Sequence, residues 1–274
     1  MIELKEPTIA KLFEVAENFR PIGQPIMTAI KDFDDAMDGG IRDGEMICIS
    51  GMSGAGKTSY ALWLNKQIAE SGVPTLFFTY EMSPWYLKEK LKAIGANQDL
   101  NTYVPIEHSG NSVEWIEGKI LEAKERYACK VVFIDHLHYL IPPNQERNTS
   151  LLIGGIARKI KSLAVKTETI IYLIAHMRKL DSGEKVNQYA VRDSALIINE
   201  SDYVYLVERL SRKKKKDLSQ EDLLADDLTN YTKVHLSKNR RTGQVINRFF
   251  NVDNGNFWQL SKEEIGELKD KIQL

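Results

Sequence analysis

One eight-residue stretch, Gly51 to Thr58, constrains this chain more than any other part of it. It reads Gly-Met-Ser-Gly-Ala-Gly-Lys-Thr and fits the pattern G-x-x-x-x-G-K-[ST], in which backbone N–H groups close around phosphates. An apolar run at 46–49 precedes it, and an amphipathic run follows it to about residue 71. A strand, a glycine-rich loop and a helix in this order predict a phosphate-binding P-loop rather than an ordinary glycine-rich turn.

The residue types in this stretch have separate expected roles. The glycines let the backbone approach the phosphates, and the helix that follows adds the positive end of its dipole. Lys57 is expected to reach the β- and γ-phosphates of a nucleoside triphosphate, and the Thr58 hydroxyl to ligate Mg²⁺. The predicted nucleotide-binding residues of the loop are Gly51, Met52, Ser53, Gly54, Ala55, Gly56, Lys57 and Thr58.

Composition narrows the class of protein. With 43% hydrophobic and 27% charged residues over 274 positions, the chain has the make-up of a globular protein with a sizeable core. Its net charge of −1 does not indicate a general nucleic-acid binder, so any basic surface must be local. Cys48 and Cys129, the only two cysteines, lie in or beside apolar runs and are expected to be buried thiols. No run approaches the ~18 apolar residues of a membrane span, so we expect a cytoplasmic protein without a membrane partner.

Strands alternate with helices in the middle of the chain. Apolar runs that predict buried strands follow the P-loop helix at 75–80, 131–134 and 170–174. Helical patterns separate them. This alternation predicts an α/β fold, with a mostly parallel sheet covered by helices on both faces.

The pattern changes after the last of these strands. Three further strands are predicted at 203–207, 232–237 and 247–252, with no helix-length apolar pattern between them. We expect them to form an antiparallel C-terminal edge of the sheet. The basic run at 212–216 is interpreted as an exposed loop, because runs of like charge are usually solvated.

The N-terminal residues 1–25 are predicted to be a unit of their own. Apolar residues recur at helical spacing over 8–20, and prolines with a glycine at 21–25 separate this N-terminal helix from the body. The helix could fold back on its own domain or dock on a neighbouring subunit. The body is assigned to residues 26–260 and a C-terminal tail to 261–274.

Polar residues follow three of the predicted parallel strands, and open α/β sheets bind ligands at these carboxyl ends. Asp135 has the position of a carboxylate that holds Mg²⁺ through water. Glu81 could activate the attacking water, or it could be an acid near the helix that begins at Ser83. His176 could sense the γ-phosphate, or it could be structural. Together with the P-loop, these residues predict a nucleotide-hydrolysis site.

The set of motifs, taken together, resembles one family. Gly51–Thr58, Glu81-Met82-Ser83, the Asp135 segment and Lys238-Asn239-Arg240 are similar, in their order and spacing, to the RecA-like motor domain of DnaB-type replicative helicases. The resemblance covers roughly residues 26–260. His176 is more similar to the phage ring primase-helicases. The implied fold is a RecA-like P-loop NTPase core, and the implied cofactors are ATP and Mg²⁺.

The resemblance also implies functions for residues that the sequence pattern alone does not assign to the site. Lys238 and Arg240 precede a turn at the sheet edge, where basic residues are usually solvated. By resemblance Glu81 is the catalytic base and Arg240 is an arginine finger for the ATP of the next subunit, with Lys238 beside it. Arg209 and Phe250 are candidates to flank the adenine.

The resemblance also implies partners. Family members form rings of six around single-stranded DNA, and the N-terminal helix would then latch onto a neighbour. Two loops that follow the Asp135 and His176 strands would face the DNA; their basic residues are Arg147, Arg178, Lys179 and Lys185. A replication loader or a primase is a further candidate partner.

Three functions fit these observations to different degrees. The first is an ATP-driven, ring-shaped DNA helicase or translocase of the DnaB type. The second is a RecA-like ATPase that acts as a loader, a recombination mediator or an ATP-switched assembly factor without unwinding. A kinase-like enzyme acting on a small molecule is weaker, because no lid-like basic segment appears on the P-loop side.

Overall fold

The computed structural model of this chain describes residues 9, 24–106, 110, 112–141, 149–177, 195–211 and 228–268. The helices are α2 (Lys31–Ala36), α3 (Lys57–Glu70), α4 (Pro84–Ala93), α5 (Val113–Tyr127), the 3₁₀ helix η1 (Leu137–Leu140), α6 (Thr149–Thr167), α7 (Ala195–Glu200) and α8 (Lys262–Leu268). The strands are β1 (Met46–Gly51), β2 (Thr75–Thr79), β3 (Thr102–Tyr103), β4 (Val131–Asp135), β5 (Ile170–His176), β6 (Tyr203–Ser211), β7 (Leu228–Asn239), β8 (Ile246–Asp253) and β9 (Asn256–Gln259). Apart from Ile9, the predicted N-terminal helix lies outside the described residues.

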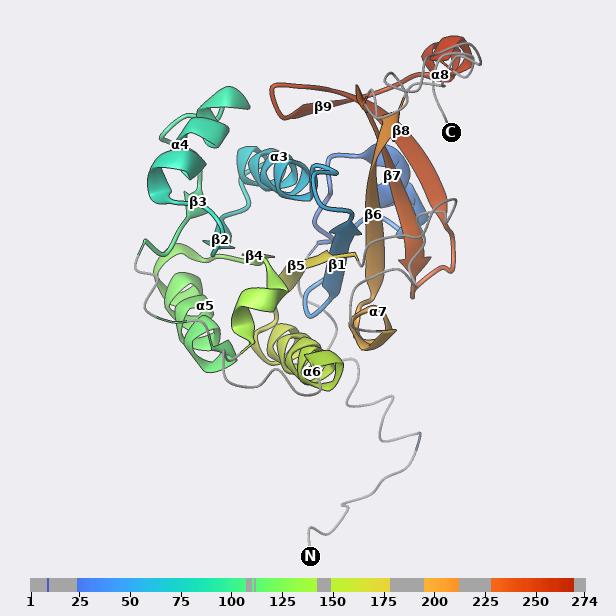
Figure 1. The fold of residues 1–274 in the computed structure, drawn as a ribbon. Coiled ribbons are helices and arrows are strands. Elements are labelled where there is room, and N and C mark those ends of the chain that lie inside the picture. The colour runs from blue at the N-terminus through green and yellow to red at the C-terminus, as the bar shows by residue number, and fades with distance from the viewer. Residues whose placement is uncertain are drawn as a thin grey trace, which may run out of the picture.

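All of these strands belong to one nine-stranded sheet, in the order β3-β2-β4-β5-β1-β6-β7-β8-β9. The strands from β3 to β6 in this order are parallel, and β7, β8 and β9 continue the sheet in antiparallel fashion. Helices α3 and α4 cover one face, and α5, α6 and α7 cover the other (Figure 1). The predicted α/β architecture with an antiparallel C-terminal edge is therefore confirmed.

The sheet separates two apolar cores, and β1 contributes to both. Ile47 and Ile49 pack in the core that contains the buried residues of α2 and α3, whereas Met46 and Cys48 pack in the core under α5 and α6. Alternate residues of a strand point to opposite faces, so a strand that is buried on both faces must be apolar throughout. Each fully buried aliphatic side chain contributes about 1.5–3 kcal/mol. This explains why continuous apolar runs, and not alternating ones, predicted the parallel strands.

Two strands, β9 and β3, go beyond the predicted ones. The hairpin β8–β9 turns through Asn254 and Gly255, with φ angles of 50° and 86°. A two-residue loop with both φ angles positive is the hairpin turn that Asn-Gly favours, so this turn was readable from the sequence. The other addition is the two-residue strand β3, which pairs only with the start of β2.

Cys48 and Cys129 are buried free thiols, as predicted. Burial raises the pKa of Cys48 to about 12 and that of Cys129 to about 11, so both remain protonated at neutral pH. Within the described part of the chain, no helix combines the length and the apolar character that crossing a bilayer requires.

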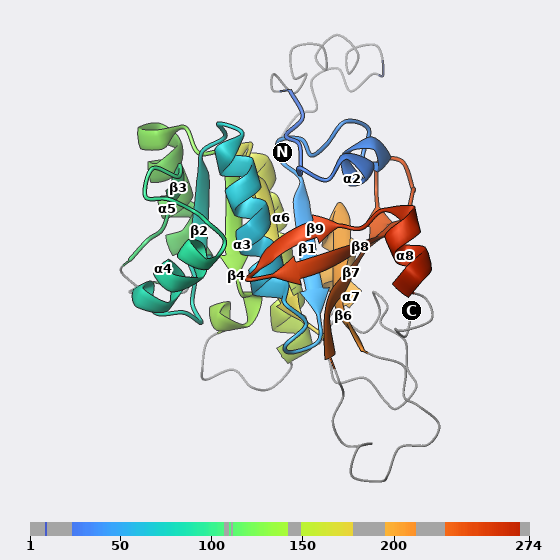
Figure 2. The ribbon, with the colours of Figure 1, turned by 90° about the horizontal axis from the view of Figure 1, so that it is seen from above.

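The fold places four strand ends side by side. The strands β2, β4, β5 and β1 are consecutive neighbours in the sheet, and all four run in the same direction. The loop between β1 and α3 lies at their carboxyl ends (Figure 2). Side chains that follow these strands in sequence, at positions far apart in the chain, are therefore brought to one edge of the sheet.

Candidate active site

The loop between β1 and α3 adopts a conformation that depends on its glycines. Gly54 and Gly56 have φ angles of 77° and 93°, in the left-handed region that residues with a Cβ atom rarely adopt. A Cβ atom on Gly51 would lie 2.3 Å from the carbonyl oxygen of Val207 on β6, so no larger residue fits there. Around Gly54 and Gly56 an added Cβ would meet nothing within 4 Å, which leaves open space beside the loop. This is the cradle that a chain of phosphates requires.

Lys57, the first residue of α3, spans this loop. Its Nζ donates a hydrogen bond of 2.9 Å to the carbonyl oxygen of Met52, and the residue is buried. Burial lowers the pKa of Lys57, while the carboxylates of Asp135 and Glu81 act in the opposite direction. The ammonium group therefore lies between the loop and two acids, where a phosphate would be a stronger partner than a carbonyl.

Thr58 and Asp135 form the second part of the site. The Thr58 hydroxyl donates to Oδ2 of Asp135 at 2.8 Å, and Asp135 is the last residue of β4. Its other oxygen, Oδ1, is buried and has no hydrogen-bond partner among the residues that the structure describes. Burial raises the pKa of Asp135 to about 6. A buried carboxylate oxygen without a hydrogen-bond partner destabilises the fold unless something binds it. Mg²⁺ prefers oxygen ligands, so the carboxylate and the neighbouring Thr58 hydroxyl fit this ion.

Glu81 lies two residues beyond β2 and turns toward two histidines. Its Oε1 is 2.7 Å from Nε2 of His136 and 3.6 Å from Nε2 of His176. The N-terminus of α4 is capped by the Ser83 hydroxyl, which accepts from the N–H of Tyr86. Glu81 therefore contacts the two histidines, and the cap of α4 is supplied by Ser83 and not by Glu81.

His176 ends β5 directly beside the phosphate loop. It is the register partner of Gly51, and the N–H of the next residue, Met177, donates to the Gly51 carbonyl at 3.1 Å. Its ring lies 4.3 Å from the ring of His136, edge to face. His176 thus touches both the strand that leads into the loop and the group around Glu81.

His136 is a site residue that the sequence analysis did not single out. It follows Asp135, is buried, and contacts Glu81 directly. Burial, together with the nearby His176, lowers the pKa of His136 to about 4, although the Glu81 carboxylate acts in the opposite direction. The signal that could have identified it is its position next to an acid at a strand end.

The predicted pair Lys238 and Arg240 lies far from this site. Lys238 pairs with Val204 at the beginning of β6, and the beginning of β6 lies beside the beginning of β1. Both basic residues are therefore at the amino-terminal edge of the parallel strands, opposite the phosphate loop of their own chain. Figure 1 shows β7 on the far side of β6 from β1.

Both cations have partners within the chain at this edge. Nζ of Lys238 donates to the carbonyl oxygens of Ile198 and Ser201 at 2.6 and 2.8 Å. Arg240 donates to Oδ1 of Asp202 at 3.0 Å and to the Asn199 carbonyl at 2.7 Å, and half of its side chain is exposed. They stabilise the carboxyl end of α7, where helices favour positive charge.

The two residues predicted to flank the adenine, Arg209 and Phe250, differ in their exposure to solvent. Arg209 on β6 is exposed and donates to the Thr229 carbonyl. Phe250 on β8 is only 1% exposed, and its ring packs against Trp63 of α3 and Phe257 of β9. We therefore correct the prediction for Phe250, because an enclosed core ring has no free face for a base.

The predicted DNA contacts Arg147, Arg178, Lys179 and Lys185 lie outside the described residues. The structure brings together Lys57, Thr58, Glu81, Asp135 and His176, and it places Lys238 and Arg240 at the opposite edge.

Lys57 gives a first prediction about this site. The Lys57→Ala variant is expected to lose nucleotide affinity and to lower turnover by about 10²–10³-fold, as removal of one donor to developing charge does elsewhere. Equilibrium binding of a fluorescent ATP analogue and phosphate release would measure the two effects. Lys66→Ala is the matched control, because Lys66 lies nine residues further along α3 and pairs with Glu70. Equal effects of the two variants would contradict the assignment.

Comparison with known proteins identifies the family of the chain. A model of the family described as the KaiC ATPase matches residues 26–212, which include the ends of β1, β2, β4 and β5. The replicative DNA helicase DnaB of Treponema pallidum (strain Nichols) is 24% identical over 201 residues, which cover 64% of this chain and 46% of that protein. The circadian clock oscillator protein KaiC of Prochlorococcus marinus (strain MIT 9313) is 37% identical over 75 residues, 27% of this chain and 15% of that protein.

Solved structures show the same fold. The ATPase domain of G40P aligns with a TM-score of 0.71 and 18% identity, over 94% of this chain and 100% of that one. A DnaB-like replicative helicase, from a study of its interactions with primase, aligns with a TM-score of 0.71 and 18% identity, over 95% and 69% of the two chains. The chain spans less than half the length of the curated DnaB relative. Because the family model matches more than half of its residues, the protein belongs to the KaiC-type family of RecA-like ATPases.

Proposed function

We propose that this protein is an ATP-driven DNA helicase or translocase of the DnaB type, which works as a ring and hydrolyses ATP between subunits. The observation that carries the proposal is the convergence of Lys57, Glu81 and Asp135 at neighbouring strand ends around a phosphate cradle. The similarity to the DnaB helicase of Treponema pallidum supports the choice of helicase within this ATPase family.

The chain's own groups divide the chemistry of hydrolysis among them. Lys57 would leave the Met52 carbonyl to hold the β- and γ-phosphates, and Thr58 with Asp135 would hold Mg²⁺. The metal ion, when bound, would neutralise charge on the phosphate oxygens. Glu81 would orient the attacking water and accept its proton, and His176 would contact the γ-phosphate from beside Gly51.

A second copy of the chain would complete the site. A nucleotide hydrolase needs a cation for the charge that develops on the γ-phosphate, and an arginine supplied by a neighbour is one known source. Arg240 and Lys238 lie at the edge opposite their own phosphate loop, and half of the Arg240 side chain is exposed. We propose that they reach the ATP bound by the next subunit, which requires Arg240 to exchange Asp202 for a phosphate.

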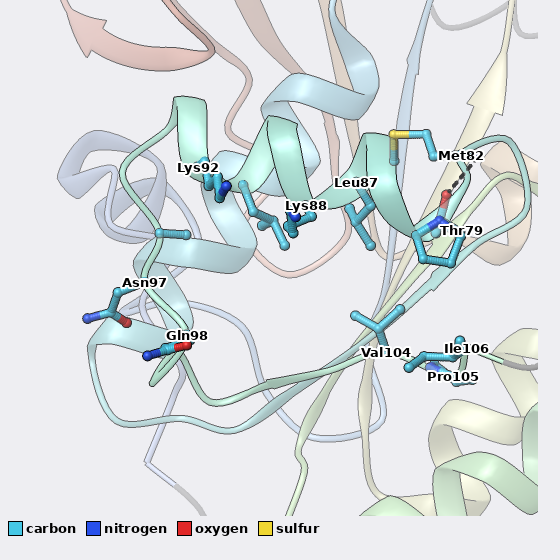
Figure 3. Close-up of a pocket in the computed structure, with 13 residues that line it drawn as sticks. Thr79, Met82, Leu87, Lys88, Lys92, Asn97, Gln98, Val104, Pro105 and Ile106 are labelled. Atoms are coloured by element: carbon cyan, nitrogen blue, oxygen red, sulfur yellow. Dashed lines mark hydrogen bonds between the residues drawn. The ribbon is translucent and has the colours of Figure 1, made fainter.

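The described structure has an apolar cavity that could receive the predicted N-terminal helix. An apolar cavity of about 370 Å³ lies between α4 and the segment 97–106 (Figure 3). Its apolar lining includes Met82, Leu87, Val104 and Ile106. Lys88 and Lys92 also line it.

We propose that residues 8–20 of a neighbouring copy occupy this cavity. That segment has an apolar face at helical spacing, which matches the apolar part of the cavity lining. Docking in trans would give a ring its subunit contacts. It also favours one of the two positions that the sequence left open for this helix.

A charge in the cavity is expected to disrupt assembly. The Ile106→Asp variant should have a lower oligomeric mass than the wild type, because Ile106 lines the cavity and is 71% exposed, so the fold tolerates the change. Light scattering with a non-hydrolysable ATP analogue would measure the mass. Leu121→Asp, an exposed position on α5, is the control. If Ile106→Asp assembles like the control, the cavity is not the docking site.

The proposed function predicts that single-stranded DNA stimulates ATP hydrolysis and that a forked duplex with a free 5′ tail is unwound. Contacts from Arg147, Arg178, Lys179 and Lys185 would be to phosphates, so affinity should fall as salt rises. The experiment measures ATP turnover and strand separation in the same reaction with Mg²⁺. Turnover with strand separation supports the helicase, and no turnover with any DNA contradicts the proposal.

A second candidate has its own support. The KaiC relatives match the chain at higher identity than the DnaB relative does, over 75 residues, and their name is that of a clock protein and not of a helicase. This favours a RecA-like ATPase that acts as a loader, mediator or ATP-controlled assembly factor. ATP hydrolysis without separation of the forked duplex would select this second function.

A further inference from the structure

The contact between Glu81 and His136 is the shortest polar contact of the proposed catalytic base. Oε1 of Glu81 lies 2.7 Å from Nε2 of His136. The His136 side chain is only 8% exposed, whereas about a third of the Glu81 side chain is exposed. The histidine is therefore the fixed member of the pair, and the glutamate is the member that can reach solvent.

The other ring nitrogen of His136 is also engaged. His136 is the N-cap of η1, and its Nδ1 accepts a hydrogen bond of 3.2 Å from the backbone N–H of His138. A backbone N–H can only donate, so Nδ1 must present a lone pair to it. In a neutral imidazole the proton then sits on Nε2, and Nε2–H donates to Glu81.

Aromatic neighbours hold the ring in this orientation. The ring of Tyr139 lies 4.9 Å from the His136 ring, and that of His176 lies 4.3 Å away, edge to face. The backbone of His136 is fixed as well, because it joins the end of β4 to the beginning of η1. The donor on Nε2 therefore points in a direction that the fold sets.

A metal ion is the alternative explanation for this cluster. Glu81, His136 and His176 each offer one ligand atom, and these atoms lie within 4.8 Å of one another. A histidine that binds a metal usually donates its second ring N–H to an acceptor. At His136 the second nitrogen accepts a hydrogen bond instead, so ligation through Nε2 would require an imidazolate. The geometry favours a hydrogen bond to Glu81.

We propose that His136 is a positioning residue, whose Nε2–H holds Oε1 of Glu81 so that Oε2 faces the attacking water. This inference rests on the proposed function, because it assigns His136 to the base of that reaction. His136 acts only through Glu81 and does not touch the nucleotide. Its loss should therefore slow the chemical step and leave nucleotide binding unchanged.

Two substitutions separate this role from a structural one. His136→Leu removes the donor, whereas His136→Gln places an amide N–H near the position of Nε2. We expect His136→Leu to lower kcat by about 10- to 100-fold, as misplacement of a reacting group does, with KM for ATP unchanged. His136→Gln should keep most of the wild-type kcat. In the Glu81→Gln background, His136→Leu should cause no further loss, because residues that act as one unit are not additive.

The outcomes distinguish failure of this inference from failure of the proposed function. An active wild type with an inactive Glu81→Gln and an unaffected His136→Leu overturns the positioning role alone. Equal losses in His136→Leu and His136→Gln, with raised KM, indicate a structural role and also overturn it. A wild type without ATPase activity overturns both proposals. Addition of Co²⁺ tests the metal alternative, and intense visible absorption that His136→Gln abolishes would overturn the hydrogen-bond role.

Discussion

The Glu81→Gln variant is expected to turn over ATP about 10²–10⁴-fold more slowly than the wild type, the range that general base catalysis contributes. Glutamine keeps the size and the polar end of the side chain but cannot accept the proton of the attacking water. Nucleotide binding should remain, because Lys57 and the loop from Gly51 to Thr58 hold the phosphates without Glu81. Phosphate release in single-turnover experiments, together with the affinity for a fluorescent ATP analogue, would measure both quantities.

A glutamate on the neighbouring helix provides the control for this variant. Glu89 lies on α4, is partly exposed and pairs with Lys92 at 3.3 Å. Glu89→Gln makes the same chemical change a few residues away and should leave turnover unchanged. If Glu81→Gln hydrolyses ATP at the wild-type rate, another group is the base. If it loses nucleotide affinity as well, Glu81 has a structural role in the site.

The Arg240→Ala variant is expected to lower turnover by about 10³–10⁵-fold, the contribution of an arginine finger. The fold should tolerate the change. Asp202, which loses the Arg240 contact, still pairs with Lys161 at 2.6 Å and accepts from the N–H of Met46 at 2.8 Å. The Arg240 side chain is half exposed, and ion pairs of exposed side chains contribute about 0–1 kcal/mol, so the thermal unfolding midpoint should change little.

Another exposed arginine controls for loss of charge. Arg158 on α6 pairs with Glu200 at 3.0 Å, and Arg158→Ala should keep wild-type turnover. Arg240→Lys should recover only part of the activity, because an ammonium cannot contact two phosphate oxygens as a guanidinium does. Wild-type turnover in Arg240→Ala, measured where the protein is fully assembled, would show that the cation comes from elsewhere.

The central sheet and the site at its edge were predictable because one physical requirement determines both. A strand that is buried on both faces must be apolar along its length, and its end is marked by the first polar residue. Asp135 and His176 are these first polar residues of β4 and β5. Neighbouring parallel strands end at the same edge of the sheet. The order of strands and helices in the sequence therefore predicted that these polar residues lie close to the P-loop.

The parts that could not be predicted depend on contacts between distant segments. The burial of Phe250 depends on how the β8–β9 hairpin packs over Trp63 of α3, and the sequence analysis had not recognised β9. The contact of His136 with Glu81 depends on the side-chain direction of a residue 55 positions earlier in the chain. The contacts of Lys238 with the end of α7 follow from the register between β6 and β7. Local patterns can indicate the β8–β9 turn, but they do not show which distant side chains these elements contact.

A mixing experiment tests most directly whether each active site is shared between two copies of the chain. Glu81→Gln and Arg240→Ala are each expected to be inactive alone. In mixed assemblies, an Arg240→Ala subunit still supplies Glu81, and a Glu81→Gln neighbour supplies Arg240. With random head-to-tail order, about a quarter of the interfaces would be intact, so the mixture should recover ATP turnover toward that fraction of the wild-type rate. If the mixture stays inactive although its subunits have exchanged, Arg240 serves its own chain or none, and the proposal of a shared site is wrong.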